Sequence, residues 1–188
     1  MPGTPKRSRP DVMKLRHLSG RFVRALWPGP PGADDLDWVE SVLTSAGFVQ
    51  FRRQPNHDQR HAIAVARDVE ARLAGTEYAG DPRWIAAALL HDLGKLDSHL
   101  GVYGRVVATV SGAIAGRDHT EQWSASRGFT RRVGLYVRHA ELGADRIRIA
   151  GEPEEAARWS TAHHDPAGWA ELPIPEPVIA ALDAADND

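Results

Sequence analysis

Apolar residues recur at three- and four-residue intervals along most of this chain, and that periodicity limits its fold more than any other feature. Such spacing places apolar side chains on one face of a helix, whereas a half-buried strand would show strict alternation. We find no convincing alternating run and no internal repeat of about 20 to 50 residues. The sequence therefore predicts an all-α fold.

Residues that break or cap helices divide the periodic segments. Residues 28–32, with three prolines and two glycines, separate a first helix from the rest, and residues 48–51 allow a short extended piece. The expected helices span residues 11–27, 34–47, 56–73, 82–91, 103–115, 130–149 with a break near Gly143, 153–164 and 175–187.

Three absences narrow the class of protein. The longest uninterrupted apolar stretch, Trp84–Leu90, is far shorter than the roughly 18 residues that span a membrane. No apolar segment follows the basic N-terminal residues as a secretory signal would, so we expect a cytoplasmic protein without a membrane partner. Because the chain has no cysteine, His, Asp and Glu must hold any metal ion.

The charge is unevenly distributed. A net charge of −2 gives no strong footprint for nucleic acid, yet residues 1–24 contain seven Lys and Arg against Asp11 alone. A basic arm on an acidic body can contact a polyanion or dock on its own domain. We favour a docked or solvated arm.

A histidine and an aspartate stand side by side at the end of an apolar helical segment. His91 and Asp92 follow directly on Trp84–Leu90, and Gly94 then ends the helix. Burying an imidazole together with a carboxylate is costly unless the two are paired or bound to a cation. The doublet therefore indicates a metal site.

The segment His91-Asp92-Leu-Gly-Lys95 resembles the signature of the HD-domain superfamily of metal-dependent phosphohydrolases. That all-helical family holds a metal with a His, a His-Asp doublet and a distant Asp. His61 corresponds to the upstream His, and Asp186 to the terminal Asp. The resemblance covers roughly residues 55–188. It implies an HD-type metal-binding domain over residues 51–188. The first 50 residues lie outside it: residues 1–10, with three prolines and a glycine, predict a disordered basic tail, and residues 11–50 resemble the accessory N-terminal helices of some bacterial members.

Further histidines resemble those of the HD-GYP branch, which binds two ions. His139 in Arg138-His-Ala-Glu-Leu-Gly143 and the pair His163-His164 occur in the expected order. The resemblance implies one ion on His61, His91, Asp92 and Asp186, and a second on His139, His163 and His164, with Asp92 bridging. Residues 165–169 lack the Gly-Tyr-Pro of that branch, so its cyclic-di-GMP specificity is not carried over.

Several of these histidines have simpler interpretations. His61 alone would be typical of a core histidine, and His139 could cap helix carbonyls. His163 and His164 point about 100° apart on an ideal helix, so both can be ligands only if the helix ends there, as Asp165-Pro166 indicates. His57 lies one turn before His61 and could replace it, although its place at a helix entrance favours a cap or a substrate contact.

Other polar residues leave alternatives open. Asp183 shares a helix face with Asp186 and is an alternative ligand or a neighbour of the ligands. Lys95 could neutralise charge on phosphate oxygens, or it could be a solvated residue at a helix end. Arg60 and Arg138 each adjoin an expected ligand, and either could grip a substrate phosphate or point outward.

Imidazole and carboxylate ligands suit Fe, Mn, Co, Ni or Zn, and we expect two divalent ions. The resemblance implies a phosphohydrolase that acts on a phosphate ester or anhydride, a nucleotide or nucleotide second messenger, through metal-activated hydroxide. Asp92 and Lys95 would be catalytic. The alternatives are a di-iron oxygenase of the same fold and a non-catalytic, metal-stabilised signalling or interaction module.

Overall fold

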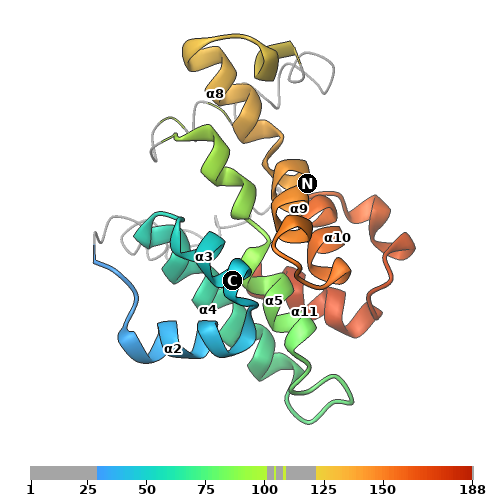
Figure 1. Ribbon diagram of the computed structural model, residues 1–188. Helices are drawn as coiled ribbons and strands as arrows, with labels where there is room; N and C mark the ends of the chain where they lie inside the picture. Colours follow the sequence, from blue (N-terminus) through green and yellow to red (C-terminus); the bar gives the residue numbers. More distant parts are fainter. Residues whose placement is uncertain (1–28, 101–103, 105–107, 109–121, 188) are drawn as a thin grey trace, which may run out of the picture.

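The computed structural model describes residues 29–100, 104, 108 and 122–187. Over these residues the chain forms helices and no strand, which confirms the predicted all-α fold (Figure 1). No helix in this part of the chain is long and apolar enough to cross a membrane. The elements are α2 (Ala33–Val42), α3 (Ser45–Arg52), α4 (Asn56–Leu73), α5 (Pro82–Leu90), the 3-10 helix η1 (Leu93–Ser98), α8 (Gly128–Val137), α9 (His139–Ile149), α10 (Glu154–Ala162), the 3-10 helix η2 (Pro166–Glu171) and α11 (Glu176–Asn187).

The expected tail over residues 1–10, the helix over 11–27 and most of the helix over 103–115 lie outside the described residues. Residues 104 and 108 are helical.

Helix α5 forms the centre of the molecule. It begins at Pro82, with the Asp81 side chain accepting the Arg83 backbone N–H, and every residue from Trp84 to Leu90 is buried. A helix that is apolar on all sides must be surrounded, and α5 packs against α2, α4, α10 and α11 (Figure 1). Its C-terminal end therefore delivers the next two residues, His91 and Asp92, into the interior.

The segment before α4 differs from its prediction. The helix expected over residues 34–47 ends at Val42, and a second helix, α3, begins at Ser45. Residues 48–51 belong to α3, so the extended piece expected there is wrong. Thr44 explains the division, because its hydroxyl caps α3 by accepting the Gly47 N–H at 2.9 Å. Glu152 holds Thr44 in place by accepting its backbone N–H at 2.9 Å.

The break expected near Gly143 is also misplaced. The chain bends at Arg138, between α8 and α9, and Gly143 lies inside α9. Gly143 faces Gly94 of the 3-10 helix η1, and a Cβ on Gly94 would overlap the backbone carbonyl of His139. Gly143 is therefore needed for close backbone approach and does not interrupt its helix.

The main core joins the described helices before and after residue 50. Val39 of α2 and Phe51 of α3 belong to the same buried cluster as Leu89 of α5 and Leu182 of α11. The boundaries of the tail, the accessory helices and the HD-type domain stay predictions.

Candidate metal centre

Five histidines and the Asp92 carboxylate converge at the C-terminal end of α5, although they come from different parts of the chain. Two groups of ligand atoms each lie within 4.8 Å of one another. One group consists of Asp92, His139, His163 and His164, and the other of His61, His91 and Asp92. Asp92 belongs to both groups, and so joins them into a single centre.

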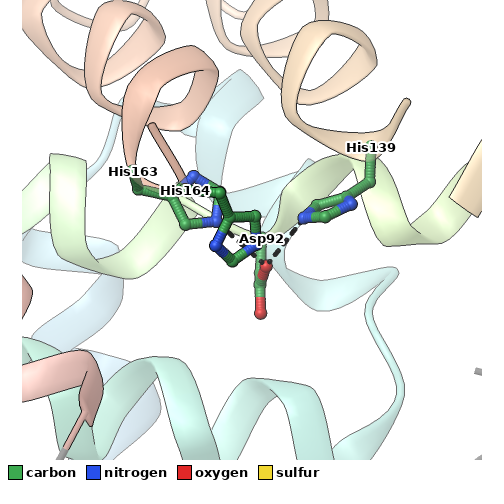
Figure 2. A group of neighbouring side chains, drawn as sticks. All are labelled: Asp92, His139, His163 and His164. Carbon is green, nitrogen blue, oxygen red and sulfur yellow. Dashed lines mark ion pairs between the residues drawn. The ribbon is translucent and has the colours of Figure 1, made fainter. Parts of the chain in front are cut away.

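The first group surrounds the Asp92 carboxylate with three imidazoles, as Figure 2 shows. The Nε2 atoms of His139 and His163 lie 3.5 and 3.8 Å from Asp92 Oδ1. Helix α10 ends at Ala162, which lets His163 and the exposed His164 both turn towards Asp92. The helix end that the Asp165-Pro166 pair predicted is confirmed.

Asp186, from the last helix, lies beside the second group. His61 Nε2 lies 3.1 Å from Asp186 Oδ1, and His91 Nε2 lies 3.5 Å from the same oxygen. His91 Nε2 is also 3.4 Å from Asp92 Oδ2. This places Asp186 beside His61 and His91, as the HD resemblance implied.

Backbone carbonyls fix the orientation of the three buried imidazoles. His91, His139 and His163 each use Nδ1 to contact the carbonyl three residues earlier, at 2.8, 2.7 and 2.8 Å. A carbonyl can only accept, so Nδ1 donates its hydrogen and Nε2 of the neutral ring keeps a lone pair. Each Nε2 is thereby prepared as a ligand, an orientation common among metal-binding histidines.

These prepared atoms have nothing to bind within the described residues. The Nε2 atoms of His91, His139 and His163 and the Oδ1 atom of Asp92 are buried without a hydrogen-bond partner. A lone pair on nitrogen cannot bond to a carboxylate oxygen, and an unsatisfied buried polar atom costs about 1–3 kcal/mol. A cation between them would satisfy all four atoms, so the residues present fit a metal ion.

The protonation of the first group suits metal binding. Burial lowers the pKa of His139 to about 4 and the pKa of His163 to about 3, and it also lowers the pKa of His164. All three imidazoles are therefore neutral at pH 7, which is the form that binds metal.

In the doublet, by contrast, the pKa of the histidine is raised. Burial alone would lower the pKa of His91, but the Asp92 and Asp186 carboxylates outweigh it and raise that pKa to about 10. Burial likewise opposes ionisation of Asp92, yet Lys95 and His91 hold its pKa well below the usual range. In the chain alone a proton therefore occupies His91 Nε2 in place of the lone pair of the neutral ring, and a metal ion would displace that proton.

The other predicted site residues lie around this centre. The Lys95 ammonium donates to Asp92 Oδ2. The Arg60 guanidinium donates to the Gly29 carbonyl, and Arg138 donates to Glu141 and Ser124.

Asp183 accepts a hydrogen bond from Asn187 at 2.8 Å and belongs to neither group of ligand atoms. His57 Nε2 lies 3.2 Å from Asp58, outside both groups. Within the described residues, the structure brings all seven expected ligands together and leaves Asp183, Arg60 and Arg138 outside both groups.

Ser160 supports the centre without any signal in the sequence. It is fully buried, and its hydroxyl donates to the backbone carbonyl of His91 at 2.9 Å. Its Oγ also lies 3.3 Å from the Ala140 carbonyl. Ser160 therefore joins α10 to the residues that carry His91 and His139. A serine within a helix gives no sequence signal for such a contact.

No protein-family model matches the chain, and no curated protein or solved structure matches it either. What is established is an all-α protein with a buried His and Asp cluster that could hold a metal ion.

Proposed function

We propose that this chain is a metal-dependent phosphohydrolase of the HD-domain type. One observation carries the proposal: the buried imidazoles of His91, His139 and His163 direct Nε2 atoms that have no hydrogen-bond partner among the described residues at the Asp92 carboxylate. The order of the ligands along the chain, from His61 through the doublet to Asp186, supports the same family. Its substrates would be phosphate esters or anhydrides, in particular nucleotides or nucleotide second messengers.

The geometry of Asp92 favours two ions. Its Oδ2 atom faces His91 at 3.4 Å, and its Oδ1 atom faces His139 at 3.5 Å. One carboxylate thus offers a different oxygen to each group of ligands, as a bridging carboxylate does. Divalent transition ions held there would supply a water of pKa near 7 and positive charge for the phosphoryl oxygens.

Lys95 has a role of its own in this proposal. Its ammonium bonds to Asp92 and keeps that carboxylate ionised, as a metal ligand must be. An ammonium has three N–H donors, so others remain for an incoming phosphate oxygen. Lys95 would therefore both orient Asp92 and bind the phosphoryl group as negative charge builds up on it.

The test is turnover by the purified protein. We would load the protein with Mn²⁺ and incubate it, without oxygen, with nucleoside mono-, di- and triphosphates and cyclic dinucleotides. Release of phosphate or of a nucleoside monophosphate, lost in the Asp92→Asn variant, is the expected result. Products that form only when oxygen is supplied would instead identify an oxygenase, and tightly bound metal without any turnover would identify a non-catalytic module.

A further inference from the structure

A pocket of 490 Å³ lies beside the metal centre. Its volume falls in the range of about 300–1,000 Å³ that is usual for small-molecule sites. The end of α3, the start of α4, the 3-10 helix η1 and α9 contribute its walls, through Arg53, His57, Lys95, His99 and Arg146. The other described residues that line it are apolar: Leu96, Leu100 and Pro55.

The described residues that line the pocket carry basic side chains and no acidic ones. Each ionisable residue among the described residues that line it is a lysine, an arginine or a histidine, and none is a carboxylate. Arg146 is held in a two-bond ion pair with Asp97, at 2.6 and 2.8 Å, so its charge is balanced and its position fixed. Arg53 differs, because its guanidinium has no ion-pair or hydrogen-bond partner among the described residues.

Lys95 connects this pocket with the metal centre. The same side chain lines the pocket and donates to Asp92 Oδ2. A substrate whose reacting phosphoryl group lies against Asp92 and Lys95 can therefore extend directly into the pocket. The part that enters meets apolar side chains from Leu96 and Leu100 and the positive charge of Arg53, which has no partner among the described residues.

We infer that this pocket binds a second phosphate group of the substrate, one that does not react, with Arg53 as its main ligand. The inference rests on the proposed function and narrows it: the preferred substrates carry two phosphate groups at separate positions. A guanidinium matches a phosphate with two parallel N–H donors, which an uncharged sugar or base could not use as well.

The test compares three probes on the metal-loaded, full-length protein. Adenosine 5′-monophosphate carries one phosphate, and adenosine 2′,5′- and 3′,5′-bisphosphate carry a second one at either position. Binding is measured by calorimetry, and the same samples are analysed by chromatography, so that any turnover is followed as initial rates. We expect at least one bisphosphate to bind about tenfold more tightly, or to show a KM about tenfold lower, than the monophosphate.

The Arg53→Gln variant should remove most of that preference and leave monophosphate binding within about twofold. Arg53 is exposed, so the variant should retain its helical circular dichroism and its metal content. The matched control is Arg158→Gln, which removes one positive charge from an exposed pair with Glu154 and should leave the preference unchanged.

Three results would overturn the inference: no preference for either bisphosphate, equal weakening of all three probes by Arg53→Gln, or the same loss in Arg158→Gln. Its failure is distinct from failure of the proposed function. Turnover without any bisphosphate preference would refute the pocket alone. An Arg53-dependent preference in binding, without hydrolysis of any compound, would support the pocket and refute the phosphohydrolase.

Discussion

At the scale of single residues, Asp92 holds the centre together by presenting its two oxygens to different neighbours. Oδ1 faces His139 and His163, and Oδ2 faces His91 and Lys95. Because the Nε2 atoms of His91, His139 and His163 have no hydrogen-bond partner in the part of the chain that the structure describes, the charge of this carboxylate matters as much as its shape. Replacement by a neutral isostere separates the two properties.

We predict that Asp92→Asn lowers the affinity for Mn²⁺ by at least about 100-fold, since it removes a ligand shared by both groups and not merely an outer contact. His91→Ala should also lose metal. Competition with a chelating dye measures the affinity, and mass spectrometry measures the metal per chain. Asp183→Asn, one turn before Asp186 and outside both groups, is the matched control. Unchanged metal content in both doublet variants would show that the centre is wrongly assigned.

The number of ions gives a second prediction. In His139→Ala and His164→Ala we expect the metal content to fall by one ion per chain, with the other kept by His61, His91, Asp92 and Asp186. Turnover should collapse, because two ions together position the attacking and phosphoryl oxygens. If these histidines were substrate contacts, the metal content would stay constant while KM rose.

Glu152 gives a prediction that does not involve metal. Burial raises its pKa, although the Thr44 hydroxyl and N–H, at 2.8 and 2.9 Å, act against that shift. A carboxyl with a raised pKa in the folded state adds stability below its unfolded pKa of about 4.3, and that stability is lost as the pH rises through the folded value.

Glu152→Gln keeps an oxygen for the Thr44 donors and removes the buried charge. We therefore expect the free energy of unfolding to rise by up to about 1 kcal/mol at pH 7. At pH 4, where Glu152 is largely protonated, the gain should vanish. Urea denaturation at both pH values measures the difference, and a gain independent of pH would contradict this account.

At the scale of elements, the approach of the 3-10 helix η1 to α9 positions the two halves of the centre. Asp92 directly precedes η1, and His139 begins α9. Gly94 and Gly143 let these backbones come close, and Ser160 of α10 lies against Gly143. A side chain at this contact would push against backbone, which cannot move aside as a flexible side chain does.

Gly94→Ala should therefore separate η1 from α9. We expect a loss of about 1–3 kcal/mol in the free energy of unfolding, as is usual for overpacking. Metal affinity should fall as well, since His139 moves away from Asp92. Gly75→Ala is a control for glycine replacement, because Gly75 has a positive φ and open space around it, so only backbone strain is expected there. Metal affinity equal to that of the unmodified chain in Gly94→Ala would disprove the positioning role.

The helices that could be predicted are those whose own sequence determines them. Helix α4 begins and ends at the expected residues 56 and 73, because a long amphipathic segment follows a proline. Contacts far along the chain decide the others: Thr44 starts α3 with the help of Glu152, 108 residues later. Gly143 has the residue type of a helix break, yet it lies within a helix because of its contact with Gly94. Such contacts are invisible to local spacing.

The candidate site divides in the same way. Its ligands could be predicted because their order resembles that of a known family. The backbone carbonyls that orient the imidazoles, and Ser160, which fixes the His91 carbonyl, could not. Every residue has a backbone carbonyl, so nothing in the sequence distinguishes the carbonyls that accept a hydrogen bond from an imidazole.

At the scale of the whole molecule, the centre exists only when segments that are far apart in the chain meet. His61 of α4 and Asp186 of α11 are 125 residues apart and lie in hydrogen-bond contact. Helix α11 packs on α4 and α5 through a buried face that includes Val178, Ile179 and Leu182. Metal binding at this centre would therefore be coupled to folding, because the unfolded chain holds no such arrangement.

Removal of residues 175–188 should abolish metal binding and sharply lower stability, since it deletes both Asp186 and a face of the core. Asp186→Asn separates the two effects, because α11 and its apolar contacts remain. At Mn²⁺ concentrations about 100-fold above the dissociation constant, an ion that binds only the folded state adds about 2.7 kcal/mol to the free energy of unfolding. We expect Mn²⁺ to raise the melting temperature of the unmodified chain, to do so much less in Asp186→Asn, and to have no effect on the truncated chain.

Circular dichroism without metal should match between the unmodified chain and Asp186→Asn. A truncated chain that still bound two Mn²⁺ ions tightly would show that α11 contributes no ligand, and the centre would then consist of the residues from His61 to His164 alone.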